Sequence, residues 1–300
     1  MHTIAVSNIK GGVGKTTTAV NLAYLLASVG RRTLLWDLDP QGAATFTLQG
    51  APNEHASARK LVAGKRELPE LVLNTAYPDL DLLPADFSYR NFDLHLNERK
   101  HPTERLLRMT AALRERYEFL VLDCPPGISL LTENVLRAAD ALVVPMLPAP
   151  LSVRTLARLQ QFIAEEGWSD LALVPFFSMV DRRRSLHVEV IAAARARFPF
   201  TLATEIPYWS EIERMSVRRA PLPAYAARSA AARLYVALLT EVLEKIPGVG
   251  QPAVLRAQLA AAAAARSGTG PETEDGNEAR GDAESSAAIK LVAGPPDGNA

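Results

Sequence analysis

The feature that most constrains this fold is a series of short apolar runs that alternate with stretches of helical periodicity. The apolar runs occupy residues 3–8, 32–39, 80–85, 119–124, 141–147, 171–178 and 201–207. The helical stretches occupy residues 15–29, 102–116, 130–139, 151–166, 185–197 and 228–245. Strands that are apolar along their whole length are buried on both faces, as in parallel sheets covered by helices. We therefore predict an α/β fold in which a doubly wound, mostly parallel sheet carries helices on both faces.

The chain changes character after about residue 247. Of its 300 residues 48% are apolar, which is enough for one large α/β domain with a sizeable core. Residues 248–266 are rich in alanine and are predicted to form a linker or a helix. Residues 267–300 hold seven acidic and two basic residues, a composition typical of disorder. We predict a folded domain at 1–247 and an acidic disordered tail. The domain and the linker together are mildly basic, with 31 basic against 26 acidic residues in 1–266.

Cysteine content and hydropathy bear on the compartment. Cys124 is the single cysteine, which excludes an intramolecular disulfide and a cysteine-paired metal or iron–sulfur site within one chain. The sequence starts directly with a strand pattern rather than with a basic and then apolar signal segment. No apolar run approaches the roughly 18 residues that a membrane-spanning helix needs. We expect a cytoplasmic protein.

A strand, a glycine-rich loop and a helix follow one another near the N-terminus. The loop reads NIKGGVGKTT (8–17), close to the P-loop pattern G-x-x-x-x-G-K-[ST], whose first glycine would fall at Ile9. Its glycines let backbone N–H groups cradle phosphate oxygens, and the helix N-terminus adds its dipole. Lys15 should reach the β- and γ-phosphates, and the Thr16 hydroxyl should bind Mg²⁺. Lys10 is then a second cation in a loop that already has its phosphate lysine.

Three carboxylates fall where such a site needs them. Asp123 ends the apolar run FLVLD, so it should project from the carboxyl edge of the sheet, where ligands bind in open α/β folds. In that position it would hold Mg²⁺ through water. Asp37 and Asp39, in DLDPQG, end another strand. Paired acids can be only a solvated loop, but beside a phosphate site one of them is expected to position the attacking water.

Together these motifs resemble a known family. The segments KGGVGKTT, DLDPQGAAT and DCPPGISLLTENVLRAADALVVP are similar to the ParA branch of the deviant Walker A ATPases, and the similarity runs to about residue 245. The P-loop variant alone specifies the wider superfamily, which includes MinD, whereas DPQG and DCPP followed by AAD indicate ParA-like proteins. One departure is Gly127, where relatives often have serine.

The resemblance implies a P-loop NTPase that uses ATP and Mg²⁺ and forms a homodimer around ATP. In the family, the signature lysine, here Lys10, contacts the phosphates bound by the partner subunit. A second cation beside Lys15 is tolerable when triphosphate charge lies between the two. The implied catalytic residues are Lys10, Lys15 and Asp39. The implied metal residues are Thr16, Asp39 and Asp123. The implied nucleotide-binding residues are Gly11, Gly12, Val13, Gly14, Lys15, Thr16, Thr17, Asp37, Pro207 and Tyr208.

The segment IPYWSEIERMSVRR (206–219) has two interpretations. Pro207 and Tyr208 are candidates for holding adenine, but packing of Tyr208 and Trp209 into the core is the preferred interpretation. Relatives that act on chromosomes usually have basic residues soon after IP, and here the cations come later.

The resemblance also implies binding to DNA without sequence preference, through arginines on the dimer face. The candidates are Arg182, Arg183, Arg184, Arg214, Arg218 and Arg219. Such contacts go to phosphates and depend steeply on salt, although three arginines in a loop are often only a solvated turn. We expect a nucleoid-associated protein whose hydrolysis is stimulated by a ParB-like protein or another cargo adaptor.

The same superfamily includes two other kinds of function. A MinD-like positioning ATPase would bind the membrane through a basic amphipathic helix, which the end of this chain lacks, so membrane binding is not expected. A metabolic relative would be an iron–sulfur carrier or an amide-forming enzyme. The single Cys124 argues against the carrier, and no additional substrate domain is visible for the enzyme.

Overall fold

The protein is built on a mixed sheet that is parallel apart from one edge. The computed structural model describes residues 1–50, 57–249 and 252–265. In this part of the chain the strands form an eight-stranded sheet of order β3-β4-β2-β5-β1-β6-β7-β8. Its strands are β1 (His2–Val6), β2 (Thr33–Asp37), β3 (Leu73–Asn74), β4 (Leu80–Leu83), β5 (Phe119–Asp123), β6 (Ala141–Met146), β7 (Ala172–Val180) and β8 (Glu205–Pro207). Only β3, paired with β4, is antiparallel among them.

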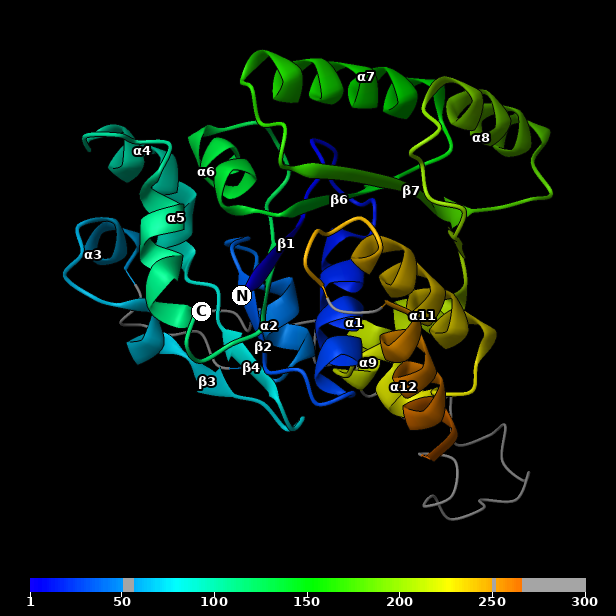
Figure 1. Cartoon of the computed structure of the whole chain (residues 1–300), viewed down its shortest axis with the longest axis horizontal. Coiled ribbons are helices and arrows are strands. Elements are labelled where there is room, and N and C mark those ends of the chain that lie inside the picture. Colours follow the sequence, from blue (N-terminus) through cyan, green and yellow to red (C-terminus); the bar gives the residue numbers. More distant parts are fainter. Residues whose placement is uncertain (51–56, 250–251, 266–300) are drawn as a thin grey trace, which may run out of the picture.

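Helices cover both faces of the sheet. Figure 1 shows α7 and α8 above β6 and β7, with α1, α9, α11 and α12 below. The lower layer comprises α1 (Lys15–Ala27), α2 (Ala43–Thr47), α9 (Ser210–Arg218), α10 (Leu222–Tyr225), α11 (Ala230–Leu243) and α12 (Pro252–Ala265). The upper layer comprises α3 (Ala58–Val62), α4 (Phe92–Asn97), α5 (Arg105–Thr110), α6 (Leu130–Ala138), α7 (Pro150–Glu165) and α8 (Ser185–Arg197). Short 3-10 helices lie at Leu68–Leu71, Phe87–Asn91 and Ala111–Leu113.

Side-chain alternation along the strands divides the core into two clusters. On β1, Ile4 and Val6 pack into the lower cluster and Ala5 into the upper one. On β2, Leu35 faces the lower layer while Leu34 and Trp36 face the upper one. Successive side chains of a strand point to opposite faces, so a strand covered on both faces must be apolar throughout. The predicted fold class is therefore confirmed.

The elements missed in the sequence are short. They comprise β3, which has two residues, and five helices of nine residues or fewer, namely α2, α3, α4, α9 and α10. One or two turns are too few for a helical period to stand out from the sequence. The single helix predicted at 102–116 is instead α5 followed by a 3-10 turn. The strand predicted at 201–207 is confined to its last three residues.

The end of the described chain is a helix packed on the domain. Helix α12 lies against α11, and its Leu259 is buried in the lower core cluster. The alanine-rich segment is therefore a helix that packs on the domain through Leu259. The division into domains stays a prediction, and the acidic tail at 267–300 lies outside the described residues. Within those residues no helix combines the length and apolarity that crossing a bilayer requires.

Burial predicts how two leucines contribute to stability. Leu35 on β2 is fully buried, whereas Leu94 on α4 is 65% exposed. Leu35→Ala should lower the free energy of unfolding by about 2–5 kcal/mol, because it leaves a cavity between packed layers. Leu94→Ala, the matched control, should change it by less than about 0.5 kcal/mol. Urea unfolding followed by circular dichroism measures both, and equal effects would contradict the assigned layers.

Candidate nucleotide-binding site

The phosphate loop connects the central strand β1 to helix α1. Gly14 is the N-cap of α1 and has a φ of 85°, a left-handed conformation that residues with a Cβ rarely adopt. A Cβ added at Gly11, Gly12 or Gly14 would meet no atom within 4 Å, so the loop borders open space. The Ser178 hydroxyl, on β7, donates a hydrogen bond of 2.7 Å to the Val13 carbonyl and holds the loop against the sheet. The loop can therefore admit phosphate oxygens close to its backbone N–H groups.

The two lysines of the loop differ in environment. Lys15 is buried, and its Nζ donates to the Lys10 carbonyl at 3.1 Å. Burial lowers the pKa of Lys15, while Asp123 and Asp39 act in the opposite direction. Lys10 is partly exposed, and its ammonium forms no ion pair with any residue that the structure describes. Lys15 is thus held inside the site, whereas the ammonium of Lys10 is available at its entrance.

Asp37 is a structural centre of the site. It ends β2, in register with Asp123 at the end of β5, and is completely buried. Its Oδ2 accepts hydrogen bonds from the backbone N–H (2.8 Å) and hydroxyl (2.7 Å) of Thr45, and its Oδ1 accepts one from the Asp39 N–H (3.2 Å). Burial raises the pKa of Asp37 to about 6. With its oxygens so engaged, Asp37 orders the loop and helix α2.

Asp123 has the properties of a buried metal ligand. It is fully buried, and neither carboxylate oxygen makes a hydrogen bond within the described structure. Burial, and then the nearby Asp37, raise the pKa of Asp123 well above its ordinary value, while Thr16 and Lys15 favour the ionised form. A buried carboxylate without partners is costly unless a cation is bound beside it. The oxygens of Asp123 and Thr16 fit Mg²⁺, a hard cation that takes few protein ligands and completes its shell with water and phosphate.

The remaining acid, Asp39, is partly exposed. Its Oδ1 accepts a hydrogen bond from the Gln41 N–H at 2.9 Å. Across the described residues, no three His, Cys, Asp or Glu side chains form a metal-binding cluster of their own. Asp39, rather than the engaged Asp37, is therefore the carboxylate that can meet a water molecule.

The start of α1 and the segment after β8 meet in one small cavity. This cavity, of about 90 Å³, is lined by Gly14 and Thr17 together with Pro207, Tyr208 and Trp209. The structure thus brings the candidate adenine residues beside the phosphate loop. The alternative of core packing is wrong, because Tyr208 is 58% and Trp209 is 40% exposed. The Tyr208 hydroxyl donates to Glu213 at 2.6 Å, which holds the ring beside α9.

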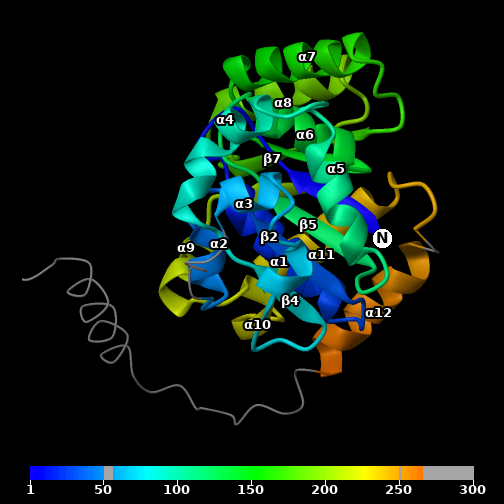
Figure 2. The ribbon, with the colours of Figure 1, turned by 90° about the vertical axis from the view of Figure 1, so that its left-hand side faces the viewer.

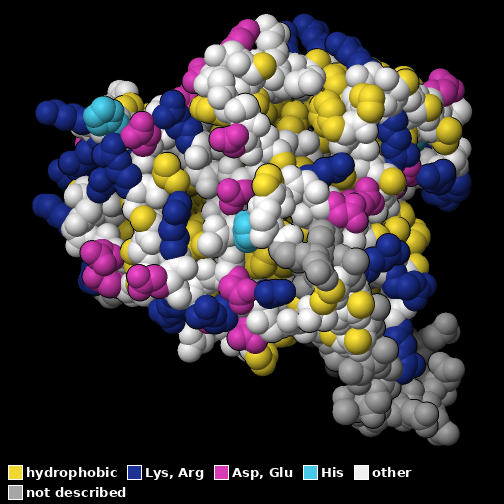
Figure 3. All heavy atoms as spheres, in the orientation of Figure 1, with side chains coloured by type: hydrophobic (Ala, Val, Ile, Leu, Met, Phe, Trp, Pro, Cys, Tyr) yellow, Lys and Arg dark blue, Asp and Glu magenta, His cyan; other side chains and the backbone are white. Residues whose placement is uncertain are grey.

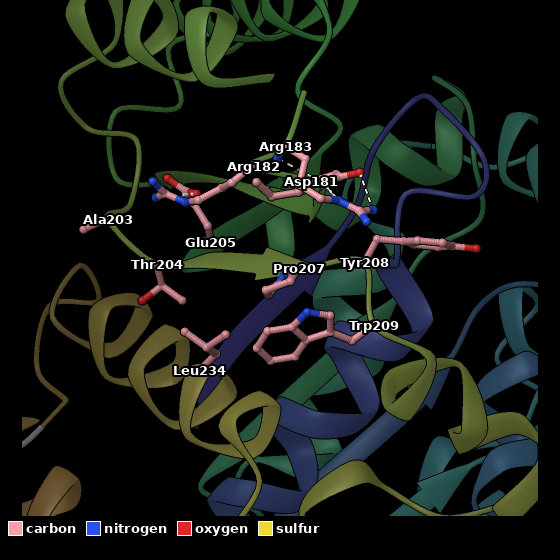
Figure 4. Close-up of a pocket in the computed structure, with 11 residues that line it drawn as sticks. Asp181, Arg182, Arg183, Ala203, Thr204, Glu205, Pro207, Tyr208, Trp209 and Leu234 are labelled. Carbon is pink, nitrogen blue, oxygen red and sulfur yellow. Dashed lines mark hydrogen bonds and ion pairs between the residues drawn. The ribbon is translucent and has the colours of Figure 1, made fainter. Parts of the chain in front are cut away.

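A larger groove of about 970 Å³ opens next to this cavity, along β8 (Figure 4). Two of the predicted DNA-binding arginines line it, and both are held by acids. Arg182 contacts Glu205 at 2.8 Å, and Arg183 forms two bonds of 2.9 Å with Asp181. These side chains are already engaged in the free protein.

The other predicted arginines are divided between two situations. Arg184, Arg214 and Arg218 are exposed and form no ion pair within the described part of the chain. Arg219 instead contacts Phe46 on α2. On the face in Figure 3, many basic side chains gather over α3, α4 and α5, at the opposite end from the groove along β8. Exposed basic residues of that end include Arg59, Lys60, Arg99, Lys100 and Arg108.

Several residues that shape the site were not singled out in the sequence. Asn8 accepts from the Lys10 N–H (3.0 Å) and donates to the Pro145 carbonyl (2.7 Å), tying the loop to β6. Ser178 and Thr45 hold the phosphate loop and Asp37 as described above. A polar residue closing an apolar run, as Asn8 does, is the signal that could have identified it. Ser178 acts through Val13, 165 positions away, and Thr45 lies eight positions from Asp37 on a short helix, so neither showed such a signal.

The glycine that departs from the family pattern has a structural reason. Gly127, in the loop after β5, has a φ of +118°. Side chains with a Cβ are strained in that conformation, so a serine here would require another backbone path. The loop after Asp123 therefore differs locally from one built around serine.

Comparisons with known proteins agree with this geometry. A family model described as an AAA domain matches residues 1–166. The sporulation initiation inhibitor protein Soj of Bacillus subtilis is 32% identical over 248 residues, covering 80% of this chain and 97% of Soj. The chromosome partitioning protein ParA of Caulobacter vibrioides is 30% identical over 253 residues, covering 82% of this chain and 95% of ParA.

Solved structures show the same architecture. Cobyrinic acid a,c-diamide synthase from Mycobacterium smegmatis, with bound ADP and magnesium, superposes with a TM-score of 0.64 at 30% identity, covering 73% of this chain and 91% of that one. A putative plasmid partition protein from Borrelia burgdorferi, bound to AMPPNP, gives 0.72 at 22% identity, covering 82% and 99%, and indicates the fold alone. The motifs, the fold and the relatives agree, and the chain belongs to the ParA/MinD superfamily of P-loop ATPases.

Proposed function

We propose that this protein is a Mg²⁺-dependent partition or positioning ATPase that dimerises around ATP and binds DNA without sequence preference in that state. Relatives named for chromosome partitioning, matched over nearly their whole length, support the general function. The observation that carries the proposal is the asymmetry of the two loop lysines. Lys15 is buried within its own site, while the Lys10 ammonium has no ion-pair partner among the described residues.

Each residue of the site has a place in this proposal. The backbone of Gly11–Gly14, the Lys15 ammonium and Thr17 hold the phosphates, and Pro207 and Tyr208 border the adenine. Thr16 and Asp123 hold Mg²⁺, with Asp39 close to its water shell. When bound, Mg²⁺ neutralises charge that develops on the phosphates. Asp37 keeps the loop of Asp39 in place, because it accepts hydrogen bonds from the Asp39 N–H and from Thr45.

Dimerisation follows from electrostatics. Two lysines in one loop repel each other unless anionic phosphates lie near both. ATP bound through Lys15 of one subunit can offer phosphate oxygens to Lys10 of the partner subunit. Hydrolysis and release of phosphate remove that bridging charge, so the dimer would separate. Asp39 positions the attacking water, and turnover stays slow until a cargo-bound, ParB-like partner completes the site.

DNA binding would depend on the dimer because dimerisation doubles the basic surface. Arg184, Arg214 and Arg218 are the free candidates, whereas Arg182 and Arg183 would first have to leave their acids. A protein that acts in this way would be cytoplasmic and associated with the nucleoid. A membrane-binding, MinD-like role is the alternative that the DNA experiment below distinguishes.

The first prediction concerns nucleotide binding. Lys15→Ala should lower ATP affinity at least about 100-fold, because it removes the buried charge paired with the phosphates. Lys10→Ala is the matched control, since it removes a lysine from the same loop and should leave the ATP affinity of the monomer near that of the wild type. Equilibrium titration with a fluorescent ATP analogue measures both. Near wild-type affinity in Lys15→Ala would refute the P-loop assignment.

The second prediction separates dimerisation from hydrolysis. Lys10→Ala should bind ATP but remain monomeric, because its phosphate contact lies across the interface. Asp39→Ala should do the reverse and accumulate as an ATP-bound dimer, since hydrolysis is blocked. Size-exclusion chromatography with light scattering, with ATP and with ADP, distinguishes these states. Normal ATP-dependent dimerisation of Lys10→Ala would exclude the cross-subunit role.

The third prediction concerns DNA. The ATP-bound Asp39→Ala dimer should bind random duplex DNA, and with about four phosphates contacted log K should fall against log[salt] with a slope near −3.6. Adding Arg214→Ala and Arg218→Ala should flatten that slope without affecting dimerisation. Lys60→Ala with Lys100→Ala is the control, because it removes the same charge from the α3–α5 end.

Two outcomes of that titration would require another account. An equal loss of slope in the Lys60/Lys100 control would place DNA at the α3–α5 end. A trapped dimer without affinity for DNA at low salt, but with affinity for anionic liposomes, would favour the membrane alternative.

A further inference from the structure

Arg219 has an unusual backbone conformation directly after α9. Its φ of 48° and ψ of 50° are left-handed, a region that residues with a Cβ seldom occupy. Helices commonly end with such a residue, but it is usually glycine. An arginine held in this conformation indicates that its side chain makes contacts that compensate.

Those contacts join the end of α9 to helix α2. The Arg219 Nε donates to the Phe46 carbonyl at 3.2 Å, and its guanidinium lies 4.6 Å from the centre of the Phe46 ring. In the other direction, the Gln49 side-chain amide donates to the Arg219 carbonyl at 3.1 Å. Figure 2 shows the two helices side by side. A side chain occupied in this way is poorly placed to contact a DNA phosphate.

Helix α2 is the continuation of the loop that carries Asp39. Thr45, adjacent to Phe46, donates to Asp37 Oδ2 from both its backbone N–H and its hydroxyl. The Thr45 hydroxyl also accepts from the Ala85 N–H at 2.8 Å. Holding Phe46 therefore holds Thr45, and Thr45 holds Asp37. The five residues of α2 are too few to form a stable helix by themselves.

The other side of α9 is anchored to the helix of the phosphate loop. Asn21, fully buried on α1, contacts the Met215 sulfur at 3.3 Å through Nδ2 and accepts from the Leu222 N–H at 2.9 Å. Met215 lies within α9, and Leu222 begins α10. The chain on either side of Arg219 is thus fixed to α1, and Arg219 extends from this fixed point to α2.

We propose that Arg219 is a positioning residue for ATP hydrolysis, which holds α2 and through it the loop of Asp37 and Asp39, and that it is not a DNA contact. The inference rests on the proposed function, because it gives Arg219 a part in the same reaction. It also links the loop that meets the γ-phosphate to α9, which carries Arg214 and Arg218.

The test removes the side chain without straining the backbone. Arg219→Gly is suitable because glycine adopts the left-handed conformation freely. It should lower kcat for ATP by about three- to tenfold and change KM by less than about twofold, because the loop is misplaced while ATP is still held. Hydrogen exchange of the α2 amides at 43–48 should become faster, a readout that needs no turnover. The DNA salt slope of the dimer should stay unchanged.

Two further variants make the test specific. Phe46→Ala removes the ring contact from the α2 side but keeps the carbonyl that accepts from the Arg219 Nε, so it should produce both effects to a smaller extent. Because Phe46 is 51% exposed, its loss leaves the core intact. The double variant should be no slower than the slower single variant. Arg197→Ala is the control, because it also removes an arginine stacked on an aromatic ring (5.1 Å to Phe198), but on α8 in the upper helical layer.

The outcomes separate this inference from the proposed function. If the wild-type protein does not hydrolyse ATP, the proposed function is refuted. Hydrogen exchange of the α2 amides would still decide whether Arg219 holds α2. An Arg219→Gly protein that matches Arg197→Ala in kcat and in α2 exchange would overturn the inference. If Arg219→Gly flattens the salt slope of DNA binding and leaves kcat unchanged, Arg219 is a DNA contact instead.

Discussion

The structure depends on two carboxyl groups buried side by side at the carboxyl edge of the sheet. Asp37 and Asp123 end neighbouring strands in register, and both are fully buried. Asp37 accepts hydrogen bonds from Thr45 and Asp39, whereas Asp123 accepts none within the described structure. An unpaired buried carboxyl group costs stability unless a cation lies beside it. Lys15 and, when bound, Mg²⁺ supply the positive charge beside these two carboxyl groups.

In the proposed dimer, the same reasoning extends from one subunit to its partner. Lys15 satisfies part of the charge within its own site, while Lys10 lies at the mouth of the loop with its ammonium unpaired among the described residues. A ligand that carries several negative charges can join both. The nucleotide would act as a removable part of the dimer interface, so that its γ-phosphate controls assembly. A chain of contacts from Asp37 through Thr45 and Phe46 to Arg219 connects the nucleotide site to the end of α9.

The sequence predicted the sheet and the centre of the site because both are encoded locally. Strands such as β5 are apolar up to their final aspartate, and the phosphate loop is a continuous motif between β1 and α1. What it did not predict depends on contacts between distant residues. Ser178 meets Val13 across 165 positions, and Arg182 is paired with Glu205 only because β8 lies beside β7. Short elements such as α2 are fixed by those contacts rather than by their own periodicity.

The most direct test of the central claim is to ask which subunit's Lys10 meets the nucleotide. Unlabelled Lys10→Ala subunits, which bind ATP, are mixed with ¹⁵N-labelled Lys15→Ala subunits, which do not. An ATP derivative with a reactive acyl group on its γ-phosphate is then added. Mass spectrometry then locates the transferred acyl group. The account predicts acylation of Lys10 on the ¹⁵N-labelled chain, and only when both subunits are present. Acylation confined to Lys15 of the unlabelled chain would contradict a nucleotide shared between subunits.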